Sequence, residues 1–121
     1  MRYIKGVTDL PESFDRGALT EAVFYILLSV HQPMHGYAIM QDISERTGGR
    51  IRMSPGTLYG AISRLLEQGL ISELPGHDDR RRSYRITAFG RAVAAAEAKR
   101  MSELLRQARA TGLVPKLKES K

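Results

Sequence analysis

Apolar residues recur at helical spacing in four stretches of the chain. The first stretch, about 18–31, is apolar on nearly every side, and Pro33 stops it. The others are 35–47, 55–68 and 88–110. Because residues three and four positions apart share one face of a helix, each stretch predicts an α-helix. A helix as apolar as the first is expected to be buried on both sides.

Shorter segments alternate between apolar and polar residues, which is the pattern of a half-buried strand. Segments 70–74 and 82–86 show it, and a turn-forming segment separates them. The pair therefore predicts a β-hairpin with Arg80 and Arg81 near its tip. The run 50–53 also alternates and predicts a very short strand.

The third predicted helix carries the clearest local signals. Ser54 is a natural N-cap, because its hydroxyl accepts a free backbone N–H of the first turn, and Pro55 suits the first helical position. Gly69 supplies the C-terminal stop. At 100° per residue, an apolar stripe lies within about 80° of Leu58. Its other members are Ala61, Ile62, Leu65 and Leu66.

The opposite side of this helix is small and polar. It holds Gly56, Gly60, Ser63, Arg64 and Glu67, with Thr57 and Tyr59 at its flanks. A glycine inside an exposed helix lowers helix stability by roughly 1 kcal/mol relative to alanine, so Gly60 is unusual at the middle of this face. A helix that enters the major groove of DNA benefits from a slim face with hydroxyl and guanidinium donors. The alternative is an ordinary surface helix that tolerates its glycine.

Basic residues gather in the second half of the chain, whose overall net charge is +6. Residues 1–49 hold four basic and six acidic residues, for a net −2, whereas residues 50–121 hold fifteen and seven, for a net +8. Arg80, Arg81 and Arg82 form one cluster at the hairpin. Guanidinium groups on such a loop suit DNA phosphates or a minor groove. The alternative is a solvated charged turn.

Taken in order along the chain, these segments resemble the PadR family of bacterial transcriptional regulators over about residues 16–110. The resemblance is to the short subfamily, which has a single C-terminal helix. The motifs that carry it are Arg16-Gly17-x-Leu19, Met34-His35-Gly36-Tyr37, Ser54-x-Gly56-Thr57-Leu58-Tyr59, Leu65-x-x-x-Gly69-Leu70-Ile71 and Tyr84-Arg85-Ile86-Thr87-x-x-Gly90. The chain departs from the family at Gly60, where proline is frequent, and at Ser83, where a second tyrosine is frequent.

The resemblance implies a dimeric DNA-binding regulator, commonly a repressor, and not an enzyme. The third helix would lie in the major groove and the hairpin, or wing, over the backbone or minor groove. The predicted DNA contacts are Ser54, Thr57, Tyr59, Gly60, Ser63 and Arg64 on the helix and Arg80, Arg81 and Arg82 on the wing. A Tyr59 ring packed in the core, with only its hydroxyl outside, is the alternative for that residue.

The last helix carries two apolar stripes instead of one. Phe89, Ala92, Val93 and Ala96 form the first, and a second, rotated by about 110°, follows it. Two displaced stripes indicate packing on the chain's own domain and then on a second subunit, with an amphipathic helix of a monomer as the alternative. The predicted dimer interface is Phe24, Leu28, Met101, Leu104, Leu105 and Ala108. A two-fold homodimer would bind double-stranded DNA at an inverted repeat.

Several kinds of chemistry lack the residues they need. The chain has no cysteine, and Pro33 separates His31 from His35, so we expect no metal site and no cofactor. A small-molecule effector stays open, although the chain has no tryptophan to sandwich a flat ligand. The N-terminus has no continuous apolar core and no stretch is long enough to span a bilayer, so we expect a cytoplasmic protein without membrane contact.

The sequence therefore predicts a mainly α (α+β) winged helix-turn-helix with a two-stranded wing and a long C-terminal helix. The expected parts are an arm at 1–17, a DNA-binding domain at 18–87, a dimerisation helix at 88–111 and a polar tail at 112–121. Two other functions stay open, namely a winged-helix module that binds proteins and a non-specific nucleic-acid-binding protein.

Overall fold

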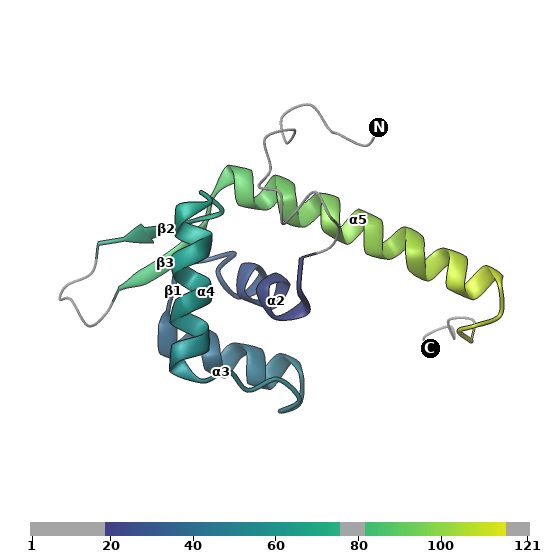
Figure 1. Ribbon diagram of the computed structural model, residues 1–121, viewed down its shortest axis with the longest axis horizontal. Coiled ribbons are helices and arrows are strands. Elements are labelled where there is room, and N and C mark those ends of the chain that lie inside the picture. Colours follow the sequence, from purple (N-terminus) through teal and green to yellow (C-terminus); the bar gives the residue numbers. More distant parts are fainter. Residues whose placement is uncertain (1–18, 76–81, 116–121) are drawn as a thin grey trace.

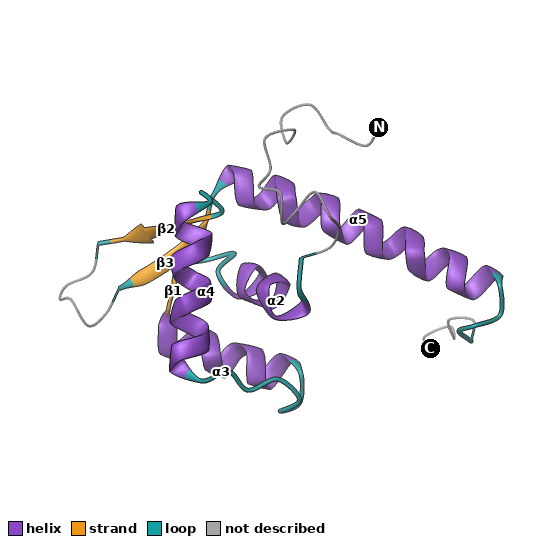
Figure 2. Ribbon diagram, in the orientation of Figure 1, coloured by secondary structure: helices purple, strands orange, loops and turns teal. Residues whose placement is uncertain are grey.

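The computed structural model describes residues 19–75 and 82–115 of the chain. Within them, four helices and three short strands make a mainly α fold with a small sheet, and α5 runs away from the sheet as one long helix (Figures 1 and 2). The elements in chain order are α2 (Glu21–Ser29), β1 (Met34–His35), α3 (Gly36–Arg46), α4 (Pro55–Glu67), β2 (Ile71–Leu74), β3 (Ser83–Ile86) and α5 (Ala88–Ala110).

Capping side chains decide where the helices begin. Ser54 caps α4 and Thr87 caps α5, as predicted, and each hydroxyl accepts a backbone N–H three residues on. The first helix is shorter than the predicted 18–31, because Thr20 caps it and the chain leaves the helix at Val30. His35 caps α3 through its ring nitrogen, which accepts the Ala38 N–H at 3.4 Å.

The sheet has three antiparallel strands in the order β1-β3-β2. The hairpin β2–β3 matches the prediction, whereas β1 was not expected, because two residues are too few to show a period. The predicted strand over 50–53 is wrong. Its alternation is real, since Ile51 and Met53 are half-buried and Arg52 is exposed, but the segment is a loop that pairs with none of the described strands.

One hydrophobic core joins the helices to the sheet. The inner stripe of α4 lies in it as predicted, with Leu58 fully buried and only Leu66 partly exposed. Between α2 and α3, the buried Ser29 hydroxyl donates to Asp42 Oδ2 at 2.7 Å, and Arg46 Nε donates to the same oxygen at 2.7 Å. Burial raises the pKa of Asp42, but these two hydrogen bonds together with nearby positive charge outweigh it and hold that pKa below its ordinary value.

The start of α5 is tied closely to the end of α4. Thr87 donates its backbone N–H to Leu70 O at 3.0 Å and its hydroxyl to Gly69 O at 2.6 Å. Gly90, in the first turn of α5, packs directly on the same backbone. A Cβ at this position would overlap Leu70 O and lie 2.8 Å from Ile86 Cγ1. This close approach sets the direction in which α5 leaves the domain.

Replacing Gly90 with alanine should lower the free energy of unfolding by about 1–3 kcal/mol, because backbone cannot move aside as a flexible side chain can. Urea denaturation measures the change. Ala95→Ser adds one atom at an exposed position of the same helix and should cost less than about 0.5 kcal/mol. Equal stability of the Gly90→Ala variant and the wild type would contradict the close packing.

Two glycines of the α4 region should respond in opposite ways to alanine. At Gly60 a Cβ meets only Arg64 Nη1, at 3.9 Å, so Gly60→Ala should stabilise the helix by about 0.5–1 kcal/mol. At Gly69 the Cβ also meets nothing, but φ is +76°, so Gly69→Ala should destabilise by about 1 kcal/mol or more. Thermal unfolding of both variants separates the effect of open space at position 60 from the effect of the positive φ at position 69. A lower melting temperature for Gly60→Ala than for the wild type would contradict the predicted gain in helix stability.

Candidate nucleic-acid interface

The outer side of α4 is exposed along most of its length, opposite the buried stripe. Ser54, Thr57, Ser63 and Arg64 are all exposed, and Gly60 is half-buried between them. In Figure 1, α4 runs across the small sheet, with α2 beside it and α3 below it. The structure therefore brings the predicted helix residues together on one accessible surface, which we call the outer face of α4.

Hydroxyl groups occupy the beginning of this face. Ser54 Oγ accepts the Thr57 N–H at 3.1 Å, and it donates to Thr57 Oγ1 at 3.0 Å. The Thr57 side chain is exposed beside it. The cap thus orders both hydroxyls at the N-terminal end of α4, where the helix dipole also favours negative charge.

Gly60 and Arg64 are one helical turn apart at the middle of the outer face. The Arg64 guanidinium lies back along the helix, so that its Nη1 is 3.9 Å from where a Gly60 Cβ would stand. Because no other side chain and no backbone outside this part of the helix comes as close, packing among the described residues does not require a glycine here. The missing side chain of Gly60 keeps the face slim next to Arg64, its one cation. Glu67, the acidic residue of the face, lies at the C-terminal end of α4.

Tyr59 is placed differently from the other residues of the face. Its side chain is 45% exposed, but its hydroxyl lies directly against the Cα of Gly36, at the start of α3. The ring is therefore neither buried in the core nor free in solvent. One edge of it stays accessible beside the outer face of α4, while its tip contacts the neighbouring helix.

The hairpin contributes an exposed basic residue. Arg82 pairs with Glu73 across the two strands, with Nε and Oε2 3.2 Å apart, and more than half of its side chain remains exposed. Tyr84, on the same strand, is buried, and this burial, with the nearby Glu73 carboxylate and Tyr59, raises its pKa. Arg80 and Arg81 lie outside the described residues, as does His77.

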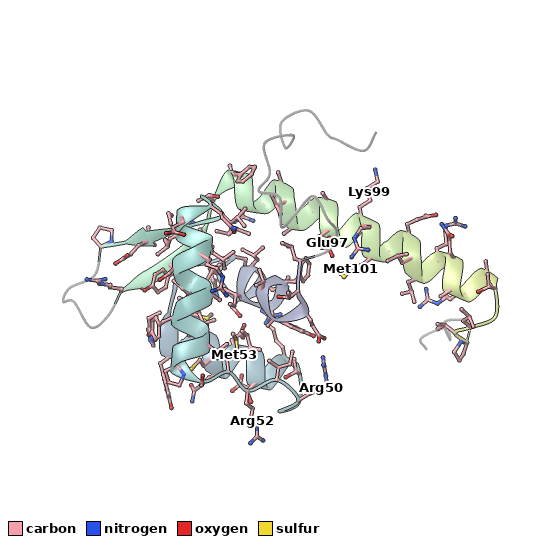
Figure 3. The ribbon with its side chains drawn as sticks, viewed as in Figure 1. Arg50, Arg52, Met53, Glu97, Lys99 and Met101 are labelled. Carbon is pink, nitrogen blue, oxygen red and sulfur yellow. The ribbon has the colours of Figure 1, made fainter. Side chains whose placement is uncertain are left out.

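The loop before α4 contributes an arginine that is not among the predicted DNA contacts. Arg52 is exposed and projects from this loop away from the body of the domain (Figure 3). Its neighbour Arg50 is held back by a double hydrogen bond to Glu21, at 2.6 and 3.1 Å, which lowers the pKa of that carboxyl. The alternation over 50–53 was the available signal, because it placed both arginines outward.

A second surface lies on the later turns of α5. Met101, Leu104 and Leu105 are 38%, 54% and 42% exposed, and Lys99 and Met101 project from opposite sides of the helix (Figure 3). Ala108 is half-buried. Of the two predicted α2 residues, Leu28 is 36% exposed, whereas Phe24 is half-buried and packs on the chain's own core. We call Met101, Leu104 and Leu105 the apolar row of α5.

The earlier turns of α5 face the domain with most of the predicted stripe. Val93 is buried and Phe89 and Ala96 are half-buried, whereas Ala92 is exposed. The inward side also includes Glu97, which is buried. Arg100 neutralises this carboxylate with two hydrogen bonds, of 2.6 and 3.1 Å. The contact with the domain therefore ends at an ion pair, just before the apolar row begins.

Within 19–75 and 82–115, no three histidine or acidic side chains come together in a way that would hold a metal ion. In this part of the chain, no helix combines the length and the apolar character that crossing a membrane requires.

Comparison with known proteins gives the family. The family model of the transcriptional regulator PadR-like family matches residues 23–96. A transcriptional regulator of Mycobacterium tuberculosis is 42% identical over 76 residues, which cover 61% of this chain and 68% of the relative. A transposon protein of Streptomyces fradiae is 39% identical over 72 residues, and this match spans 60% of the chain but only 20% of the length of that protein.

Solved structures show the same fold. A PadR family regulator from Eggerthella lenta superposes with a TM-score of 0.62 at 25% identity, covering 91% of this chain and 94% of the other. Bacillus subtilis PadR, solved in complex with operator DNA, superposes with a TM-score of 0.54 at 19% identity, over 63% of this chain and 45% of the other. The predicted winged helix-turn-helix is thus confirmed, and the chain belongs to the PadR-like family of transcriptional regulators.

Proposed function

We propose that this chain is a repressor that binds an inverted-repeat operator as a homodimer, with α4 in the major groove of DNA. The observation that carries the proposal is the outer face of α4, which is exposed, slim and polar, while the opposite side holds the core. Bacillus subtilis PadR, a relative in fold, has been solved with operator DNA, which supports the same use of the fold here.

The residues of this face match the chemistry of DNA recognition. Arg64 offers a guanidinium that suits a guanine edge or a phosphate, and Thr57 and Ser63 offer hydroxyls. Gly60 lets the helix backbone approach the groove closely. Arg52 and Arg82 are further exposed cations that we assign to the phosphates, together with Arg80 and Arg81 of the wing.

The apolar row of α5 supports the homodimer. Its three large side chains are adjacent on one side of the helix and at least a third exposed. Leu28 of α2 is a further exposed apolar residue, and we assign these side chains to the surface that a second subunit would cover. On this basis we assign DNA binding to 18–87 and dimerisation to 88–111, with 1–17 as an arm and 112–121 as a tail. Two-fold symmetry would then present two copies of α4 to one duplex.

Removing the arginine of the outer face should weaken operator binding. For Arg64→Ala we expect a loss of about 1–3 kcal/mol, or roughly 5- to 100-fold in affinity, measured by fluorescence anisotropy on DNA from upstream of the chain's own gene. Arg106→Ala is the matched control, because it removes the same charge from an exposed, ion-paired position on α5. Its affinity should stay within about threefold of the wild type.

The same titrations separate the other two functions. Wild-type affinity should fall steeply as salt rises, and random DNA should bind far more weakly than the operator. Equal affinity for both DNAs would indicate a non-specific nucleic-acid-binding protein. No binding even at low salt would favour a module that binds proteins, and equal losses in the two arginine variants would contradict the role of α4.

A charge in the apolar row should separate the subunits. Each interface residue occurs twice in a two-fold dimer, so Leu104→Glu should raise the dimer dissociation constant at least about 100-fold. Sedimentation equilibrium measures it. Ser102→Glu adds the same charge at an exposed position on another side of α5 and should leave the dimer intact. A wild-type chain that is monomeric at micromolar concentration would refute the homodimer.

A further inference from the structure

The first residue of α3, Gly36, is buried against the side chain of Tyr59 from α4. A Cβ at position 36 would overlap the Tyr59 hydroxyl oxygen, and it would lie 2.6 Å from Cζ and 3.0 Å from Cε1 of the ring. Carbon atoms in favourable contact are about 3.5–4.0 Å apart. The phenol can therefore lie where it does only because residue 36 has no side chain.

Backbone conformation does not explain this glycine. The described glycines with positive φ are Gly48, Gly49, Gly69 and Gly112, and Gly36 is not among them. An L-residue would fit the backbone at position 36 and would improve the helix. Gly56, also in the first turn of its helix, shows the contrast, since a Cβ there meets nothing within 4 Å. Space for the Tyr59 ring is the remaining reason for Gly36.

The contact lies where three elements meet. Met34 and His35, directly before Gly36, pair with Tyr84 and Ser83 of β3. Tyr59 belongs to α4, and its phenol is close enough to Tyr84 to affect the pKa of that residue. The tip of Tyr59 therefore joins α4 to the start of α3 and, through β1, to the strand that carries the wing.

We infer that Gly36 is a positioning residue for DNA recognition, because its lack of a side chain lets the Tyr59 ring lie against α3 and so keeps the outer face of α4 clear. This inference rests on the proposed DNA binding. The atoms that a methyl group would strike are the far end of a side chain that is 45% exposed. The ring has room to swing outward, and the fold survives. A ring that swings outward enters the space between α4 and DNA.

The distinguishing result is a loss of DNA affinity without a matching loss of fold. We expect Gly36→Ala to bind operator DNA about tenfold more weakly, while its melting temperature stays within a few degrees of the wild type. In tyrosine-labelled protein, the NMR signal of the Tyr59 ring should shift. Gly56→Ala is the matched control for stability and for the ring signal, and there the signal should not move.

A double variant tests whether the effect passes through Tyr59. Against a Tyr59→Ala background, Gly36→Ala should cause no further loss of affinity, measured at low salt where weak binding remains detectable. An equal further loss would overturn the inference, as would an unshifted ring signal or a wild-type affinity in Gly36→Ala. If the wild-type chain itself binds no DNA, the proposed function fails. That outcome differs from the three above, in which the wild-type chain binds DNA and only the role of Gly36 is refuted.

Discussion

Burial of one side of α4 is the interaction on which the other features depend. Leu58, Ile62 and Leu65 are almost completely buried, and each contributes about 1.5–3 kcal/mol by leaving water. A rotation of α4 about its axis would expose these side chains, so the helix is held in one orientation. The outer face is the direct consequence, because the residues that cannot pack inward are the hydroxyls, the glycine and the arginine opposite that stripe.

Two close contacts at glycines set how the neighbouring elements meet α4. Gly90 lets α5 begin directly on the backbone of Leu70, just after α4 ends. Gly36 lets the Tyr59 ring lie across the start of α3. The first contact is backbone against backbone and leaves no room for adjustment. The second contact is against the tip of the Tyr59 side chain, and this tip can be displaced at a smaller cost in free energy. We therefore connect Gly36 with recognition and not with folding.

The long helix α5 contributes to two different surfaces, one along its first turns and one along its later turns. Its first turns pack on the domain through Val93 and end at the buried Glu97, whose charge Arg100 neutralises. Beyond that ion pair α5 continues past the rest of the described domain (Figure 1), and the three side chains of its apolar row are exposed. One continuous helix is stiff over this length, so a partner bound to its later turns would be held in a defined relation to α4.

The sequence by itself determined the helices, the hairpin and the face of α4 that points outward. These follow from local rules, since Ser54 and Thr87 cap their own helices and the apolar stripe repeats every three or four residues. The sequence also led to one error of the same local kind. Residues 50–53 alternate as a strand does, but a strand needs a partner, and alternation alone does not show whether one is present.

The tertiary structure decided what depends on contacts between distant residues. The strand β1 exists because β3 lies beside it, Arg50 is drawn to Glu21 across 29 positions of the chain, and Arg52 becomes the outward cation of that loop. Likewise, Gly36 and Tyr59 are 23 positions apart, and nothing in either motif shows that one exists to accommodate the other. A local pattern specifies which side of an element is apolar, but only packing specifies what that side meets.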